Sequence, residues 1–135
     1  MLIINADDLG RSTAETDAAL RCFQAGRITS GSFMVFMPDS ERAAGLVREA
    51  NLDVGLHLNF TEPFTSACCS TGLVDAQRRV ARFLRRNSEF LLLAGTASVE
   101  VIMTHPTLKF EREFLMSDAF PPMLRGLDIG SYRQL

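Results

Sequence analysis

The chain has 135 residues, of which 47% are hydrophobic and 22% are charged, and its formal net charge is -2 at pH 7. This length and composition predict one globular domain over residues 1–135, and the small net charge gives no electrostatic reason to expect nucleic acid or a membrane as a partner. The sequence has no apolar run of the ~20 residues that span a bilayer and no basic region before an N-terminal apolar core. We therefore expect a cytoplasmic protein.

The chain opens on an apolar strand pattern that ends in two adjacent carboxylates. Residues 2–4 suit a strand buried on both faces of a sheet, and Asp7 and Asp8 fall where this strand leaves the sheet. On extended backbone the two side chains point in opposite directions, so one carboxylate could bind a cation while the other handles a proton. The alternative is that the pair forms a turn and caps a helix.

Alternating helix and strand patterns with short connections follow the Asp pair. Ser12 and Glu15 have the spacing of a capping box, and Gly26 fits the left-handed residue that closes a helix. Further along, we expect strands over Thr29–Met37 and Val54–Phe60, with a helix between them from Asp39 or Ser40 to about Ala50. This order predicts the α/β class, with a parallel sheet built from right-handed crossover units.

A histidine lies within the strand predicted over Val54–Phe60. A single histidine in an apolar strand is more often a core residue than a ligand. In a parallel sheet, however, the carboxyl ends of the first and third strands lie on the same edge, which would bring His57 close to Asp8. A carboxylate and an imidazole are ligands from which sites for Zn²⁺ and other divalent ions are built.

The segment after this strand holds a loop and then an arginine-rich helix. We expect the loop over residues 64–72 and the helix over 75–86, with Val80, Phe83 and Leu84 facing inward and five arginines facing out. The arginine face is either a solvated surface or a contact for an acidic partner or a neighbouring subunit.

A second histidine follows the next predicted strand. Residues 89–93 are either a helical turn or a short bridging segment, and residues 99–103 have a strand pattern. Pro106 restricts His105 to extended geometry at the exit of this strand. The remaining predicted elements are a helix over 110–116, a short helix from 117 or 118 to 126, and a strand over 127–129.

Four motifs occur along the chain in a fixed order. They are Ile-Ile-Asn-Ala-Asp-Asp-Leu-Gly at 3–10, Thr-Ser-Gly-Ser at 29–32 with Met37-Pro38, Gly-Leu-His-Leu-Asn at 55–59, and Val-Ile-Met-Thr-His-Pro at 101–106. Together they resemble the YdjC family of carbohydrate deacetylases, and so do Glu111–Ser117 and the closing segment Ile129–Leu135. The resemblance covers roughly residues 1–63 and 95–135.

The resemblance implies a (β/α) barrel and a divalent-metal-dependent N-deacetylase that acts on an acetylated amino sugar or oligosaccharide. Asp7 would be the general base, and His105 the histidine near the leaving group. Asp8 and His57 would be ligands of a Zn²⁺ or Mg²⁺ ion, which would polarise the amide carbonyl and lower the pKa of its bound water. The residues expected to bind the carbohydrate substrate are Asn59, Thr61 and Glu62.

The chain departs from the family in its middle. Family members are usually much longer, and a histidine-rich strand in their central region supplies a third metal ligand. Between Pro63 and Ala94 this chain has no histidine, and its only carboxylates there are Asp75 and Glu89. We therefore predict a truncated or incomplete barrel with a central deletion roughly within residues 64–94, and a metal that two protein ligands hold weakly.

The predicted deletion also bears on assembly and on activity. A closed sheet that loses its central strands has unpaired edges, which pair readily with another chain. We therefore predict a homodimer or higher homo-oligomer that covers the open edge, with the arginine-rich helix as the candidate contact. Two functions stay open: an active deacetylase, favoured by the four retained site residues, and a catalytically degenerate relative that keeps a carbohydrate- or metal-binding cleft or serves as an oligomeric binding module.

Overall fold

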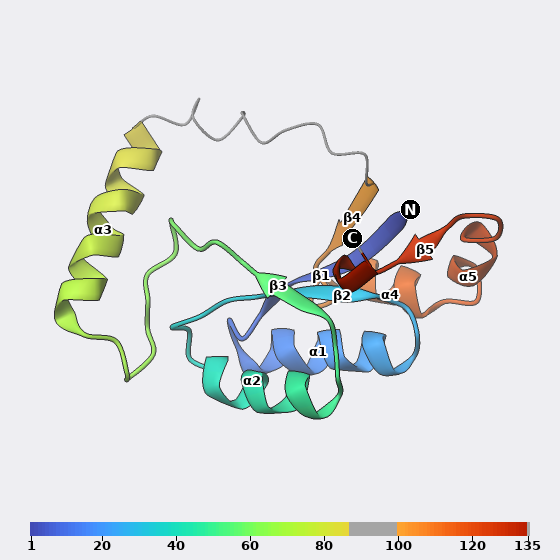
Figure 1. Cartoon of the computed structure of the whole chain (residues 1–135), viewed down its shortest axis with the longest axis horizontal. Helices are drawn as coiled ribbons and strands as arrows, with labels where there is room; N and C mark the ends of the chain where they lie inside the picture. The colour runs from blue at the N-terminus through green and yellow to red at the C-terminus, as the bar shows by residue number, and fades with distance from the viewer. Residues whose placement is uncertain (87–99, 135) are drawn as a thin grey trace.

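The computed structural model describes residues 1–86 and 100–134 of the chain, which form an α/β structure (Figure 1). The segment 89–93, whose structure the sequence left open, lies outside these residues. The elements are β1 (Leu2–Leu9), α1 (Thr13–Gln24), β2 (Ser30–Phe33), α2 (Ser40–Glu49), β3 (Val54–Leu56), α3 (Thr71–Arg86), β4 (Glu100–Thr104), α4 (Lys109–Met116), α5 (Phe120–Met123), β5 (Ile129–Gly130) and the 3₁₀ turn η2 (Tyr132–Gln134).

The five strands form one parallel sheet in which β1 is central. The strand order is β3-β2-β1-β4, and β5 pairs with the N-terminal end of β1. Ala6 lies opposite Gly31 of β2 on one side and Thr104 of β4 on the other, while Leu2 lies opposite Ile129 of β5. The predicted parallel α/β sheet is therefore confirmed, and the sheet is open, as an incomplete barrel would be.

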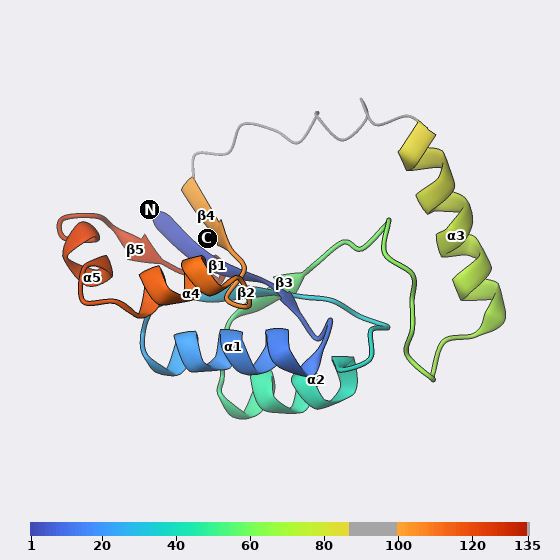
Figure 2. The ribbon, with the colours of Figure 1, turned by 180° about the vertical axis from the view of Figure 1, so that it is seen from behind.

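Helices α1, α2 and α4 pack on one face of this sheet. Figures 1 and 2 show α1 and α2 together on the same side of the strands. Ile4 and Ala6 of β1 belong to the hydrophobic core on this side, to which α4 contributes Leu115. Because side chains alternate along a strand, Asn5 and Asp7 face the opposite side, which would be the interior of a closed barrel.

The central strand is buried on both faces, as its sequence predicted. Ile3 and Ile4 point to opposite sides, yet their side chains are 0% and 1% exposed. Burial of such a side chain stabilises a fold by about 1.5–3 kcal/mol. These contacts fix β1 in the middle of the sheet and so fix where Asp7 and Asp8 emerge.

The start and end of α1 also follow the prediction. Ser12 is the N-cap, its hydroxyl accepts a hydrogen bond from the backbone N–H of Glu15 at 3.4 Å, and the two side chains are hydrogen-bonded to each other. After the helix, Gly26 adopts a φ of +65°. The capping box and the left-handed residue after the helix are therefore both confirmed.

Two strands are shorter than predicted. β2 stops at Phe33 rather than Met37, because Phe36 has a φ of +62° and a residue in that conformation cannot continue a strand. β3 stops at Leu56, and the backbone N–H of His57 makes a last hydrogen bond to the carbonyl of Phe33 at 2.9 Å. His57 therefore lies just beyond a strand end rather than within a strand.

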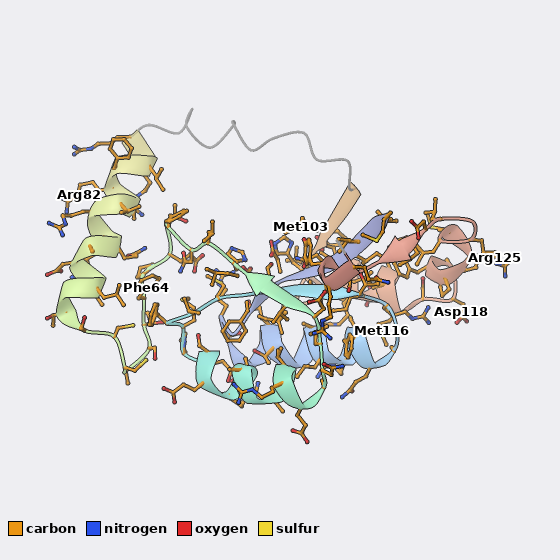
Figure 3. The ribbon with its side chains drawn as sticks, viewed as in Figure 1. Phe64, Arg82, Met103, Met116, Asp118 and Arg125 are labelled. Carbon is orange, nitrogen blue, oxygen red and sulfur yellow. The ribbon has the colours of Figure 1, made fainter. Side chains whose placement is uncertain are left out.

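Helix α3 differs most from the prediction. It begins at Thr71 instead of Asp75, and it stands away from the sheet (Figure 1). Val80 and Phe83 were expected to face inward, but they are 41% and 54% exposed. The prediction was wrong because the helix does not lie along the sheet. The five arginines are exposed as expected, and Figure 3 shows Arg82 on the outer side of the helix.

One glutamine joins α3 to the loop that precedes it. The side-chain amide of Gln77 donates hydrogen bonds to the backbone carbonyls of Phe60 at 3.2 Å and Glu62 at 2.7 Å. Gln77 and Ala81 are the buried residues of the helix. Polar contacts of Gln77 therefore hold α3 in place, whereas its apolar sequence pattern had predicted hydrophobic contacts.

The last elements follow the predicted order with shorter lengths. β4 and α4 match their predicted segments closely, whereas α5 is limited to four residues and β5 to two. Two prolines at the start of α5 favour a helical turn there, because a proline fits the first turn of a helix. None of the described helices has the length and apolar character that a membrane span requires.

A glycine pair tests the turn that follows β1. Gly10 has a φ of +87°, and a Cβ there would lie 2.8 Å from the carbonyl oxygen of Met34, whereas a Cβ on Gly45 of α2 would meet no atom within 4 Å. We expect Gly10→Ala to lower the free energy of unfolding by about 1–3 kcal/mol and Gly45→Ala to raise it by about 0.5–1 kcal/mol. Urea denaturation followed by circular dichroism measures the free energy of unfolding of both variants. Equal effects of the two substitutions would contradict the requirement for glycine in the turn at Gly10.

An ion-pair network between α1 and α2 predicts a pH dependence. The Asp39 carboxylate accepts hydrogen bonds from Nε and Nη2 of Arg42 at 2.7 and 2.8 Å, and Arg42 also reaches Asp17 of α1 at 2.9 Å. These bonds hold the pKa of Asp39 below its ordinary value. Its contribution to stability is therefore complete above the ordinary carboxyl pKa and is lost as the pH falls through the lowered value.

We expect Asp39→Asn to lower the free energy of unfolding at pH 7 by about 1 kcal/mol, and the difference from wild type to disappear in acid once Asp39 is protonated. Urea denaturation at pH 7 and at stepwise lower pH measures this difference. Asp75→Asn is the control, because the carboxylate of Asp75 is exposed. A difference that stayed constant with pH would contradict the network.

Candidate active site

The end of β1 is bent so that both aspartates face the same histidine. The pairing of β1 with β2 shifts register between Ala6 and Leu9, and Asp8 has a φ of +66°. Nδ1 of His57 lies 3.1 Å from Oδ1 of Asp7 and 3.6 Å from Oδ1 of Asp8. Extended backbone would point the two carboxylates apart, as predicted from the sequence, but the left-handed residue brings them together.

Asp7 sits in a polar setting that is largely closed to solvent. Its side chain is 12% exposed, and its Oδ1 accepts a hydrogen bond from the hydroxyl of Ser32, which in turn accepts one from Nδ2 of Asn5 at 3.1 Å. Burial is the main cause that raises the pKa of Asp7; His57 and His105 oppose the shift, and the charge of Asp8 adds to it. The carboxylate therefore takes up a proton more readily than an ordinary aspartate.

The second histidine approaches Asp7 from the end of β4. Nε2 of His105 lies 4.0 Å from Oδ2 of Asp7, on the side of the carboxylate away from the Oδ1 that faces His57. Glu111 of α4 holds this residue, because its carboxylate accepts a hydrogen bond from the backbone N–H of His105 at 2.6 Å. The structure thus brings together Asp7, Asp8, His57 and His105, of which the sequence had placed Asp8 and His57 on one edge of the sheet.

The three predicted substrate-binding residues lie in the loop between β3 and α3. Arg11 links this loop to the site, because its guanidinium contacts Oδ2 of Asp8 at 3.2 Å and Oε1 of Glu62 at 2.8 Å. Asn59 holds the loop itself, with hydrogen bonds to the backbone N–H and carbonyl of Glu62 at 2.9 and 3.1 Å. Thr61 is exposed. The roles of Asn59, Thr61 and Glu62 in binding the substrate stay predictions.

A cavity of about 370 Å³ opens beside Asp7 on the sheet face opposite α1 and α2. Six of its residues were not named as site residues from the sequence: Asn5, Ser32, Leu56, Leu58, Met103 and Tyr132. Asn5 lies two positions before Asp7 on the same face of β1, so strand alternation could have found it. Figure 3 shows Met103 on this side of the sheet. Tyr132 comes from the C-terminal turn, which no local pattern connects with Asp7.

The comparisons with known proteins agree with the sequence motifs. A family model described as YdjC-like protein matches residues 1–102. The chain belongs to the YdjC-like family. The family that the motifs predicted is thereby confirmed. The first three motifs, with Asp7, Asp8 and His57, lie within the matched segment, and His105 lies beyond it.

Curated relatives of this family member are named as deacetylases. The carbohydrate deacetylase of Geobacillus stearothermophilus is 36% identical over 89 residues, which are 65% of this chain and 32% of that protein. The carbohydrate deacetylase of Brevibacillus brevis is 33% identical over 100 residues, 73% of this chain and 39% of that protein. The chitooligosaccharide deacetylase of Serratia marcescens is 29% identical over 113 residues, 83% of this chain and 43% of that protein. The matches thus span less than half of each of these relatives, and a deletion within 64–94 stays a prediction.

The donor set of this YdjC-like chain fits two ligands of a divalent ion. Ligand atoms about 2.0–2.1 Å from a tetrahedral Zn²⁺ lie about 3.4 Å apart, close to the 3.6 Å between Asp8 Oδ1 and His57 Nδ1. Within residues 1–86 and 100–134, no group of three His, Cys, Asp or Glu side chains is arranged to hold a metal ion. Asp8 and His57 are therefore the pair with which a metal-binding role can be tested.

The partly buried charge of Asp7 predicts an effect on stability. Asparagine keeps the oxygen that Ser32 and His57 contact but carries no charge, and the raised pKa of Asp7 means that the fold disfavours its ionised form. We expect Asp7→Asn to raise the free energy of unfolding at pH 7, even though it removes the proposed base. Urea denaturation of both proteins measures the difference, and a destabilised variant would contradict this account of Asp7.

Proposed function

We propose that the chain is a divalent-metal-dependent N-deacetylase that removes the acetyl group from an acetylated amino sugar or oligosaccharide. The observation that carries the proposal is the position of the partly buried Asp7 between His57 and His105, beside Asp8. The relatives named carbohydrate deacetylase and chitooligosaccharide deacetylase support the choice of substrate class.

Each site residue has a distinct task in this reaction. Asp8 and His57 would hold the ion, which when bound polarises the amide carbonyl and lowers the pKa of a water molecule. Asp7 takes the proton of the attacking water, a task that suits a carboxyl group whose pKa is raised by burial. His105 then gives a proton to the departing amine, with its backbone held by Glu111.

Two further residues keep these groups in place. Ser32 donates its hydroxyl hydrogen to Asp7, so that one carboxylate oxygen is fixed while the other faces His105. Arg11 bonds Asp8 from the side of the Glu62 loop and offsets part of the negative charge of the aspartate pair. Fixed side chains of this kind reduce the reorganisation that a reaction requires.

The second candidate function is binding without turnover. It is favoured by the finding that the described residues hold no group of three metal-ligating side chains, because two ligands bind a metal more weakly than three. Such a protein would keep a carbohydrate- or metal-binding cleft, or act as an oligomeric binding module, and would release no acetate.

We also propose that the chain assembles as a homodimer, with the arginine-rich helix α3 as the candidate contact. Among the described strands, β3 and β4 are the edges of the sheet, and an uncovered edge is a template for pairing with a second copy. A single-chain mass in light scattering at micromolar concentration would contradict this assembly. The cytoplasmic location stays a prediction from the sequence.

Metal binding and acetate release test the reaction together. We expect isothermal titration to detect binding of Zn²⁺ to the wild type, and Asp8→Ala or His57→Ala to weaken it at least tenfold. Acetate release from N-acetylglucosamine oligomers should fall at least a hundredfold in both variants, because the polarising ion is lost.

Asp75→Ala is the matched control for these variants, since Asp75 is an exposed carboxylate on α3. It should leave both measurements unchanged. If the wild type releases no acetate with Zn²⁺, Mg²⁺ or Ni²⁺ in excess, the deacetylase proposal fails. Metal or sugar binding that persists without acetate release would then identify the binding function.

A further inference from the structure

The C-terminal turn contributes a tyrosine to the cavity beside Asp7. Tyr132 follows β5, and it lines the cavity together with Asp7, Ser32 and His57. These three residues come from β1, β2 and the end of β3, so the turn brings the end of the chain onto the face where the proposed reaction takes place. In Figure 1, η2 lies beside β1 and β2, near the middle of the sheet.

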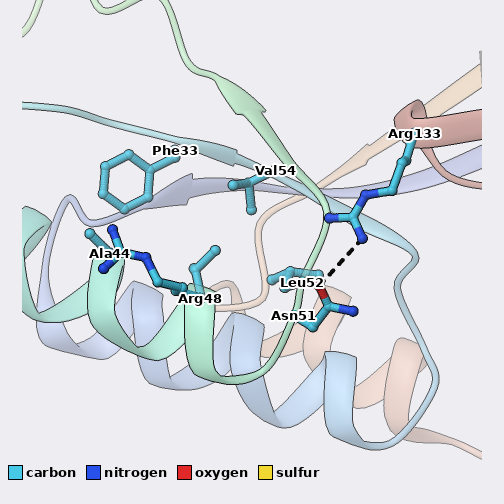
Figure 4. Close-up of a pocket in the computed structure, with 8 residues that line it drawn as sticks. Phe33, Ala44, Arg48, Asn51, Leu52, Val54 and Arg133 are labelled. Carbon is cyan, nitrogen blue, oxygen red and sulfur yellow. Dashed lines mark hydrogen bonds between the residues drawn. The ribbon is translucent and has the colours of Figure 1, made fainter.

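Backbone and side-chain contacts hold this turn against the sheet. The backbone N–H of Tyr132 donates to the hydroxyl of Ser30 at 3.4 Å, and that of Arg133 donates to the carboxylate of Asp53 at 2.6 Å. Figure 4 shows the guanidinium of Arg133 bonded to Asn51, at 3.3 Å, across a second pocket between α2 and β3. The contacts of Arg133 with Asp53 and Asn51 therefore hold η2 in place, and the ring of Tyr132 lies at the cavity.

The phenol is a neutral hydrogen-bond donor with an apolar body. Burial, Asp7 and Asp53 all raise its pKa above the ordinary value, so the hydroxyl keeps its hydrogen at physiological pH. Within the part of the chain that the structure describes, no hydrogen bond of this hydroxyl is present. A ring that is partly buried at a cavity, and whose hydroxyl the fold does not use, is available to a ligand.

We propose that Tyr132 is a substrate-contacting residue, whose hydroxyl donates a hydrogen bond to the carbohydrate bound beside Asp7. This inference rests on the proposed function for its substrate class and adds a residue to the site. The apolar side chains of Leu56, Leu58 and Met103 complete the walls of the cavity around it. The other lining residues, Asn5, Asp7, Ser32 and His57, carry polar groups, and apolar walls with convergent polar groups are typical of a small-molecule site.

The composition of the chain supplies a direct probe. Tyr132 is the only tyrosine and the chain has no tryptophan, so tyrosine emission reports on this residue alone. We expect titration with N,N′-diacetylchitobiose to change the emission saturably, with the same Kd that calorimetry gives. Tyr132→Phe should weaken binding about tenfold, the effect of one lost hydrogen bond, and leave the urea midpoint unchanged because the fold does not use the hydroxyl.

A relocated tyrosine is the control for the emission signal. Phe23 lies on α1, on the sheet face away from the cavity, and it packs against the core. In the double variant Tyr132→Phe with Phe23→Tyr, the emission should not respond to the sugar, and the affinity should match that of Tyr132→Phe alone.

The outcomes separate this inference from the proposed function. Binding of the sugar by Tyr132→Phe within twofold of the wild type overturns the role of Tyr132, even if acetate is released. Failure of the wild type to bind the sugar overturns it as well. Sugar binding that depends on Tyr132 without acetate release supports the contact and contradicts the deacetylase.

Discussion

The structure depends on the burial of β1 on both faces in the middle of the sheet. Ile3 and Ile4 fill the two sides of this strand, and β2, β4 and β5 all pair with it. Because its partners are parallel, the carboxyl ends of β1, β3 and β4 meet at one edge. The positions of Asp7, His57 and His105 are therefore consequences of the same hydrophobic contacts that hold the fold together.

Two local features at this edge work against stability. Asp8 occupies a left-handed conformation, which costs free energy for any residue other than glycine, and Asp7 carries a charge in a place where burial disfavours it. Strained backbone and buried charges concentrate at functional sites, where the rest of the fold offsets their cost. The two aspartates thus have the physical character of site residues, independently of the names of the relatives.

The sequence predicted what short-range chemistry and the topology of parallel sheets determine. The Ser12–Glu15 cap depends on a three-residue spacing, and the meeting of Asp8 with His57 depends on strand order. Other features depend on contacts that spacing does not encode. The direction of the Asp8 side chain follows from one backbone angle. The apolar side chains of α3 were expected to face inward, but the helix does not cover the sheet and they are exposed. Tyr132 reaches the cavity only because β5 pairs with β1.

The joining of the two chain ends in one sheet has a kinetic consequence. The hydroxyl of Thr104 donates to the carbonyl of Asn5 across 99 positions, and the N–H of Tyr132 meets Ser30 across 102. Contacts between such distant positions form late, because closing a long loop loses entropy before any pairing is gained. During synthesis, β1 leaves the ribosome long before its partners β4 and β5. The aspartates are thus made before β4 and η2, and their surroundings are completed only when these later segments dock.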